Sequence, residues 1–520
     1  MSAIRLIIGR ILPIAVSFSA LGMSPARAEI PTLEVAAAAA AFVAPTIDPT
    51  KVWDGSIARW SNPTNWNPTG LPEAADRVLV GNGGSVSAIS FNAIDAAMTA
   101  LTIYGGDAAA AGLRSVFWQS PAAPRSLVVT EALVIGGASA NERGALLLSG
   151  GVLSTLDTWV VSTPADGTDE FRQTGGVHTA SSRLILSPVD ANARAQYTLA
   201  DGALRTGSTI LDAQSGGAAQ FNHEGGTHTT GALEVGKGAT YRLQGTGSLD
   251  AKTVTNTGTI SVEGGAIATA TLVNTGEFSF VGGKHEMAGS VQNGGLYQIL
   301  NGGDVVHTGA FVNDGTARIL GSTAAFTTMT NRGHLDVDPS TVSFVDLTVG
   351  TRGWITATAG DRFLIQNSFV NHSARADLWS TGAAILEFTG VGERSLLTPG
   401  SAAFGWGELV IDDGAIVQLG DGDVVPGGGF YAGKLTGLKI EGNVVTNVYG
   451  NGVGLYYNPA LNPDLAGLAL TLADGGTLAA IPEPATHALL AAGLVLIIGL
   501  ALRRRTGGRP AAWRMATSPG

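Results

Sequence analysis

The sequence predicts an all-β protein built as a parallel β-solenoid, in which each coil of the chain stacks on the previous one. Two observations favour this fold class. Short alternations of apolar and polar residues are separated by glycines, and glycine accounts for 73 of the 520 residues, about twice its usual share. The pattern also recurs at a nearly fixed period, which is typical of repeat architectures.

An Asn-x-Gly triplet marks the clearest repeat, and its copies are 18, 19, 20 and 18 residues apart. A strand, a turn and a second strand account for one coil of this length, and stacking pairs every interior strand edge. We expect Asn and Gly to form the turn because both tolerate left-handed backbone angles. The triplets begin at Asn256, Asn274, Asn293, Asn313 and Asn331.

A looser series lies upstream, with aromatic or apolar alternations that lead into Gly turns at steps of 25, 26, 24 and about 20 residues. Its units begin at Leu146, Phe171, Tyr197, Phe221 and Tyr241. These units resemble the passenger repeats of autotransporter-type adhesins, and that resemblance implies a right-handed parallel β-helix. At roughly 20–25 residues per coil, residues 80–420 give about 15 coils. An array of β-sandwiches is the alternative, with hairpin-linked strands every 8–12 residues or so.

The two flanks of the solenoid differ from its repeats. Residues 51–80 contain Trp53, Trp60 and Trp66, which we interpret as a cap over the open apolar end of the first coil. Sugar stacking is the alternative role for these tryptophans. The Ala- and Pro-rich residues 29–50 are expected to form a linker.

Residues 81–400 are therefore assigned to the solenoid and residues 401–480 to a small C-terminal β element that closes it. The second segment contains a Tyr456-Tyr457-Asn458-Pro459 stretch followed by a Gly-Gly-x-Leu run. It resembles the region that precedes the sorting signal in a subgroup of PEP-CTERM proteins.

The N-terminus has the pattern of a secretory signal peptide over residues 1–28. Arg5 and Arg10 give a positive n-region, residues 11–21 form a short apolar core, and Ala26 and Ala28 mark the cleavage site. The core is too short to span a membrane comfortably. We therefore expect the chain to be exported.

The C-terminus carries a three-part signal over residues 481–505. A Pro-Glu-Pro triplet precedes an apolar segment at 485–502, which is near the lower length limit for a membrane helix. The arginines after it favour a cytoplasmic tail at 506–520. This arrangement closely resembles the PEP-CTERM sorting signal of Gram-negative bacteria. The residues concerned are Pro482, Glu483 and Pro484 for processing, and Arg503, Arg504 and Arg505 for the membrane stop.

The resemblance implies a cellular destination for the protein and an enzyme that processes it. An exosortase in the inner membrane is expected to cut near the triplet, so that the protein is anchored in that membrane before processing. Afterwards it would lie at the cell envelope surface or outside the cell.

Composition narrows the partners further. The formal charge is −11, and residues 29–484 carry −19 because residues 1–28 and 485–520 hold eight arginines and no acidic residue. Such acidity argues against nucleic acid as a partner and leaves divalent cations open. The chain has no Cys, so packing and backbone hydrogen bonds must stabilise it and thiol catalysis is excluded.

Histidine provides the nearest approach to a metal signature. His223 and His228 are five residues apart with two glycines between them, whereas a zincin helix needs a spacing of four. We therefore reject a protease site. His178, His228 and His285 each follow a Gly-Gly pair, and we expect them to be solvated turn residues along one edge, with no metal bound.

A β-helical polysaccharide lyase or hydrolase is the alternative function, because such enzymes need clustered carboxylates. The candidates are Asp412, Asp413, Asp421 and Asp423. The repeats lack long inserted loops that would wall a cleft, and no nucleophile, phosphate-loop or calcium-loop motif is present. We therefore expect a non-enzymatic protein without a cofactor, with a structural or adhesive role in the envelope, a biofilm or the exopolysaccharide.

Overall fold

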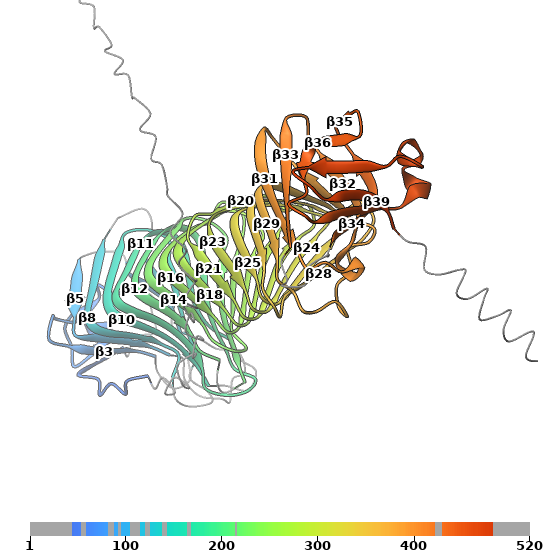
Figure 1. Cartoon of the computed structure of the whole chain (residues 1–520). Helices are drawn as coiled ribbons and strands as arrows, with labels where there is room; N and C mark the ends of the chain where they lie inside the picture. The colour runs from blue at the N-terminus through green and yellow to red at the C-terminus, as the bar shows by residue number, and fades with distance from the viewer. Residues whose placement is uncertain are drawn as a thin grey trace, which may run out of the picture. The chain divides into compact units, whose positions relative to one another are not determined.

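The described chain forms a single β-solenoid of about 16 turns (Figure 1). The computed structural model describes residues 44–53, 59–81, 88–91, 95–104, 115–119, 125–137, 143–163, 168–213, 216–421 and 429–481. Within these ranges 39 strands join one sheet and no α-helix occurs. The predicted fold class is confirmed, while the right-handed sense of the coil stays a prediction.

The first coils are built from short strands that lead into longer ones. Trp66 and Trp53 are paired where β1 meets β2 in antiparallel fashion, and the coils that follow pair in parallel. These elements are β1 (Lys51–Trp53), η1 (Pro63–Asn65), β2 (Trp66–Asn67), β3 (Arg77–Val80), β4 (Ala88–Phe91), β5 (Ala96–Met98), β6 (Ala100–Ile103), β7 (Ser115–Gln119), β8 (Ser126–Ile135) and β9 (Gly144–Leu148).

The next coils contain the longest strands. Val152 is paired with Val177, Val177 with Ala203, and Ala203 with Thr227, which are steps of 25, 26 and 24 residues. The looser sequence repeat is thus the coil itself. The strands are β10 (Val152–Ser162), β11 (Thr168–Pro188), β12 (Arg194–Leu211), β13 (Ala218–His223), β14 (Thr227–Val235), β15 (Thr240–Leu243) and β16 (Ser248–Asn256).

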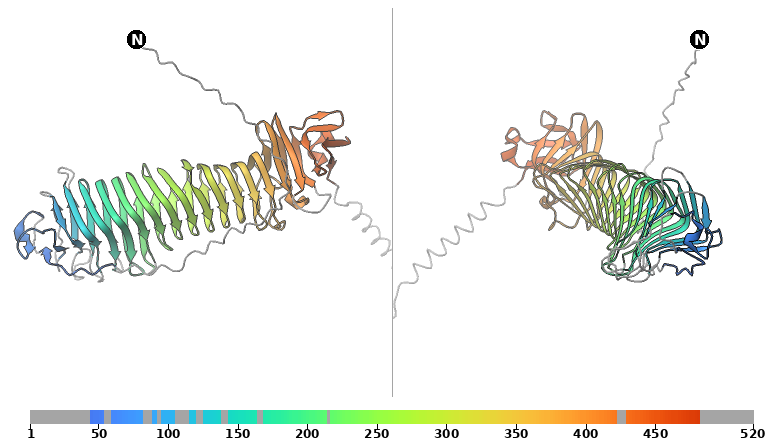
Figure 2. Two further views of the ribbon diagram at one scale, coloured as in Figure 1. Left: turned by 60° about the vertical axis from the view of Figure 1, so that its left-hand side comes forward. Right: turned by 180° about the vertical axis from the view of Figure 1, so that it is seen from behind.

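The narrower coils carry the Asn-x-Gly repeat, and nearly all of them consist of one short and one long strand. Successive short strands pair in parallel, as do successive long strands (Figure 2). These strands are β17 (Thr259–Val262), β18 (Ala266–Asn274), β19 (Glu277–Val281), β20 (Lys284–Met287), β21 (Ser290–Asn293), β22 (Leu296–Leu300), β23 (Asp304–Asn313), β24 (Thr316–Leu320), β25 (Thr323–Asn331), β26 (His334–Asp338), β27 (Thr341–Val349), β28 (Trp354–Ala357) and β29 (Arg362–Asn371).

The C-terminal coils continue the same sheet and end in a hairpin. Leu470 on β38 pairs with Leu478 on β39 in antiparallel fashion, while β39 also pairs in parallel with β37. The elements are β30 (Ile385–Phe388), β31 (Gly392–Thr398), η2 (Ala402–Phe404), β32 (Trp406–Ile411), β33 (Ala415–Asp421), β34 (Gly429–Thr436), β35 (Ile440–Glu441), β36 (Val444–Tyr449), β37 (Gly454–Tyr457), η3 (Pro459–Leu461), η4 (Pro463–Leu465), β38 (Leu470–Ala473) and β39 (Thr477–Ala480).

The glycines of the Asn-x-Gly repeat are required for a reason other than the predicted one. None of these glycines or asparagines has a positive φ, so the left-handed turn was wrong. Instead, a Cβ at Gly276 or Gly315 would lie 2.2 Å from the carbonyl oxygen of the repeat glycine in the preceding coil. Two backbones pass so closely here that only glycine fits.

Replacing Gly315 by Ala should therefore lower the free energy of unfolding by about 2–3 kcal/mol, because the new methyl group must push two coils apart. Gly382→Ala is the matched control, since a Cβ there has no atom within 4 Å and Gly382 is not among the positive-φ residues. The shift of the urea unfolding midpoint measures both changes. Equal midpoints for the two variants would contradict close coil approach at Gly315.

The asparagines of the repeat form a buried ladder along the stacking direction. Each is the last residue of its strand, and the Nδ2 of each of the first four donates to the Oδ1 of the next asparagine at 2.7 Å. The same Nδ2 of Asn274 also donates to the carbonyl of Leu296 at 2.9 Å. Every amide in this ladder thus links neighbouring coils, and none is exposed by more than 1%. The ladder runs through Asn256, Asn274, Asn293, Asn313 and Asn331.

We expect Asn293→Ala to lower the free energy of unfolding by about 2–4 kcal/mol, since it removes the donor to Asn313 and the acceptor for Asn274 within a buried site. Asn367→Ala serves as control because Asn367 is exposed and bonds only to Asp346 among the described side chains. Urea unfolding of both proteins checks this. An Asn293 variant as stable as the Asn367 variant would show that the ladder contributes nothing.

The core contains aromatic rings stacked along the coil axis. Tyr197, Phe221 and Tyr241 follow Phe171 at ring-centroid distances of 4.6, 4.9 and 4.8 Å, and all four are fully buried. The spacing matches the separation of neighbouring strands, so one ring per coil fills the interior without voids.

The three N-terminal tryptophans lie inside the first coil. Trp53, Trp60 and Trp66 are at most 2% exposed and contact each other edge to face, and Trp60 also packs on Phe91. Their buried indoles leave no face for sugar stacking. Toward the end of the predicted linker, Ala44 and Ile47 pack against a second apolar cluster on the outside of the coils, which includes Trp159 and Ile185.

Candidate functional site

The three histidines predicted to be solvated are buried, and that prediction was wrong. His178 and His228 have no exposed surface and His285 has 7%. The register pairs His178 with Leu204 and Leu204 with His228, so the two histidines lie two coils apart in one column, and this column points inward. A leucine in the same column is the signal that the position is internal.

Tyrosine hydroxyl groups contact the buried imidazoles of His178, His223 and His228, while His285 Nε2 contacts the carbonyl oxygen of Gly282. His178 Nδ1 lies 3.0 Å from the Tyr197 hydroxyl, which donates to Gln173 Oε1 at 2.7 Å. His223 and His228 approach the hydroxyl of one residue, Tyr241, at 2.9 and 3.1 Å. The histidines of the rejected protease motif therefore do converge, but on a phenol, and they form part of a core network.

Burial fixes these histidines in the neutral form. Desolvation lowers the pKa of His178 to about 3 and that of His223 to about 4, and it lowers the pKa of His228 well below the usual range. Burial also raises the pKa of Tyr241 well above its usual value. The network therefore stays uncharged throughout the neutral pH range.

The depressed histidine pKa values predict that acid destabilises the fold. Between pH 6.5 and about 3 the unfolded chain binds a proton at His178 and the folded chain does not, so stability falls as the pH falls. Each such histidine contributes up to about 1.4 kcal/mol per pH unit in that window.

We expect His178→Gln to reduce the dependence of the unfolding free energy on pH between 6.5 and 4, whatever its stability at pH 7. The exposed residue His372 gives the control variant His372→Gln. Urea unfolding at several pH values measures both slopes. An unchanged slope for His178→Gln would show that this imidazole is protonated in the folded state.

The candidate carboxylates do not form a described catalytic pair. Asp413 is 94% exposed at its side chain and binds Lys439 Nζ at 2.6 Å, and this contact lowers its pKa. The side chains of Asp421 and Asp423 lie outside the described residues, so a carboxylate cluster that includes them stays a prediction. Across the described ranges no group of three or more His, Asp or Glu residues is placed to hold a metal ion.

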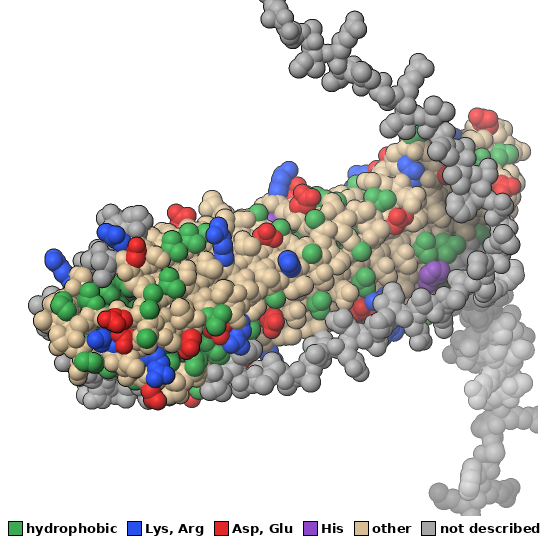
Figure 3. Space-filling view, turned by 90° about the vertical axis from the view of Figure 1, so that its left-hand side faces the viewer, with side chains coloured by type: hydrophobic (Ala, Val, Ile, Leu, Met, Phe, Trp, Pro, Cys, Tyr) green, Lys and Arg blue, Asp and Glu red, His purple; other side chains and the backbone are tan. Residues whose placement is uncertain are grey.

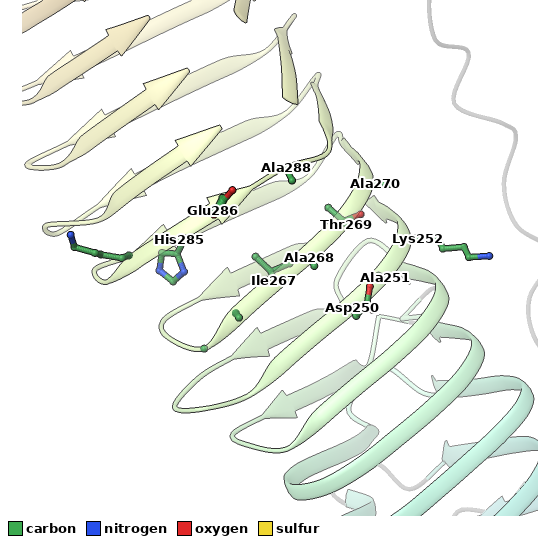
Figure 4. A pocket seen from close by; sticks show the side chains of 13 residues that line it. Asp250, Ala251, Lys252, Ile267, Ala268, Thr269, Ala270, His285, Glu286 and Ala288 are labelled. Carbon is green, nitrogen blue, oxygen red and sulfur yellow. The ribbon is translucent and has the colours of Figure 1, made fainter. Parts of the chain in front are cut away.

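A recess of about 590 Å³ opens where the sheet is locally split (Figure 4). The first half of β18 pairs with β16 but forms no described ladder with β20, which pairs onward with β23. Backbone groups of Ala266, Ala268 and Glu286 border this opening, and His285 lies beneath it with no described hydrogen-bond partner for Nδ1. Exposed polar backbone at this site can bind water or ligand hydroxyl groups.

Charged side chains are scattered over the solenoid surface without a single-sign patch on the face shown in Figure 3. Many of them pair between neighbouring coils, as in Arg242 with Glu263 and Arg318 with Asp336. The guanidinium of Arg242 holds the pKa of Glu263 at about 2. Each of these exposed ion pairs contributes little to stability, and each places a positive side chain next to a negative one on the surface.

Comparison with known proteins identifies one segment of the chain. Residues 480–505 match the family model described as the PEP-CTERM protein-sorting motif. No curated protein and no solved structure matches the chain significantly. The chain is thus a β-solenoid protein with a C-terminal sorting motif. More particularly, it carries a PEP-CTERM motif, which marks an exported, envelope-associated protein that an exosortase processes.

The predicted processing and membrane residues lie outside the described residues. These are Ala26, Ala28, Pro482, Glu483, Pro484, Arg503, Arg504 and Arg505, together with the predicted membrane segment 485–502. Within the described part of the chain, no helix has the length and apolar character needed to cross a membrane.

Proposed function

We propose that this protein is a non-catalytic structural or adhesive component of the cell surface, associated with exopolysaccharide or a biofilm matrix. The observation that carries the proposal is the position of the sorting motif relative to the fold. β39 ends at Ala480, and the backbone N–H of Ile481 donates to the carbonyl of Tyr457 at 2.7 Å. Processing near residues 482–485 would therefore release the solenoid with all of its described coils.

The regular outer surface is the functional part in this proposal. Parallel ladders fix each strand about 4.8 Å from the next, so side chains at equal repeat positions form rows along the solenoid. Such rows present the same polar groups many times, which suits weak multivalent contact with a long polymer or with other cells. The buried histidines support a role without catalysis, since tyrosine hydroxyls and other core groups engage His178 and His228.

Processing by exosortase requires the motif and an anchor for the chain before cleavage. Deletion of residues 482–520 should therefore release the protein in soluble form or send it to the wrong compartment, and fractionation with immunoblotting measures this. Replacing Pro482, Glu483 and Pro484 by Ala should instead leave the unprocessed chain in the inner membrane, because the apolar segment remains. Pro459→Ala, outside the motif, is the control.

Mass spectrometry of the mature C-terminus gives an independent test. A terminus within residues 482–485 is expected in the wild type. A mature protein that retains residues 503–505, or a deletion variant with unchanged localisation, would contradict processing through this motif.

A further inference from the structure

A small aromatic slot lies on the C-terminal coils, apart from the recess at β18 and β20. It has a volume of about 360 Å³, which is in the size range of small-ligand sites. Its lining includes Trp379, Ala402, Ala403, Gly405, Tyr431 and Ile481, and none of the described residues that line it is charged. The slot therefore suits a neutral ligand.

Tyr431 is the residue that gives the slot its chemistry. Its ring stacks on Tyr456 of the next coil, with centroids 4.8 Å apart and planes at 16°. Tyr456 in turn lies over backbone, because a Cβ at Gly429 would be 2.2 Å from its Cε2. The next coil therefore fixes one face of Tyr431 in place.

The preceding coil lies on the other side of Tyr431 from Tyr456 and contributes Gly405 and Trp406 to the lining of the slot. Trp406 is paired with Ala432, so Gly405 lies opposite Tyr431. A Cβ at Gly405 would be only 3.3 Å from the Cβ of Tyr431, and glycine leaves this space open. Ala403, which is exposed, also lines the slot. A rigid ring thus borders an opening on the side that Tyr456 does not cover.

Polar groups accompany the aromatic ring. The hydroxyl of Ser380 is exposed at the slot. Trp379 Nε1 donates a hydrogen bond of 2.8 Å to the hydroxyl of Thr381, which in turn donates to the carbonyl oxygen of Gly405 at 2.7 Å. These bonds fix the loop that forms one wall. A flat apolar face beside hydroxyl and backbone groups matches the alternating apolar and hydroxyl surfaces of a sugar ring.

We propose that this slot binds a neutral sugar unit of a polysaccharide, with its ring packed against Tyr431. This inference rests on the proposed function, because the slot would be a defined site at which the protein contacts the polysaccharide matrix. The slot ends at Ile481, which precedes the Pro-Glu-Pro triplet, so processing at residues 482–485 leaves it complete.

The test measures binding of cellobiose and maltose to the purified full chain by isothermal titration calorimetry, with digalacturonate as an anionic comparison. Saturable binding of at least one neutral disaccharide, tighter than that of digalacturonate, is expected. Tyr431→Ala should weaken it by about tenfold or more, because it removes the stacking face. Tyr431→Phe should retain binding within about twofold, since the ring remains.

Two further variants separate the slot from general effects on folding. Ala403→Trp should block binding by filling the opening while Tyr431 stays intact. Trp354→Ala is the matched control, because His334 and Arg375 already pack on the Trp354 ring and it should not contact a sugar. Circular dichroism confirms that each variant is folded.

Absence of saturable binding, or equal affinity in Tyr431→Ala and Trp354→Ala, would overturn the proposal. Tighter binding of digalacturonate would overturn the assignment of a neutral ligand. If the sorting proposal fails, localisation of the motif variants stays as in the wild type and sugar affinity is unaffected, so the two outcomes are distinguishable.

Discussion

Backbone hydrogen bonding between successive coils is the constraint on which the rest of this structure depends. A parallel ladder holds neighbouring strands about 4.8 Å apart, so every residue has a counterpart directly above and below it. An inward-facing side chain must therefore pack against the side chains directly above and below it at that spacing. Planar amides, flat rings and glycine meet this requirement, and the described coils use all three.

The same constraint explains why buried polar groups are tolerated. The Asn274 amide is satisfied by its neighbours in the column and by one carbonyl, so the ladder leaves few unpaired groups. The imidazoles of His223 and His228 reach one tyrosine hydroxyl because consecutive coils bring them together. In sequence His223 and His228 resemble a metal-binding motif, but in the structure they belong to the core. Burial keeps both imidazoles uncharged.

The molecule has two functional parts, a folded β-solenoid and a short sorting motif that directs its export and processing. The sorting motif begins where β39 ends, so the body is complete before the processing site. The described surface offers regular rows, a local split in the sheet at β18 and β20, and a small aromatic slot near the end. An exported solenoid with these features is suited to repeated weak contact, which one deep pocket would not provide.

The sequence by itself determined the solenoid, its coil lengths and the sorting motif, because each is written as a local pattern or a fixed period that needs no knowledge of distant contacts. The tertiary structure alone decided which way each repeat position faces. His178 and His228 looked like turn residues, yet they share a column with Leu204 and point inward. The glycine of Asn-x-Gly looked like a residue of a left-handed turn. Glycine is required there because the carbonyl oxygen of the preceding coil leaves no room for a Cβ. The open side of Tyr431 likewise depends on Gly405, which is 26 residues away in sequence and adjacent only through the ladder. Contacts between coils join residues that are distant in the sequence. The sequence pattern therefore shows the period of the repeat, whereas packing between coils determines which side chains point inward.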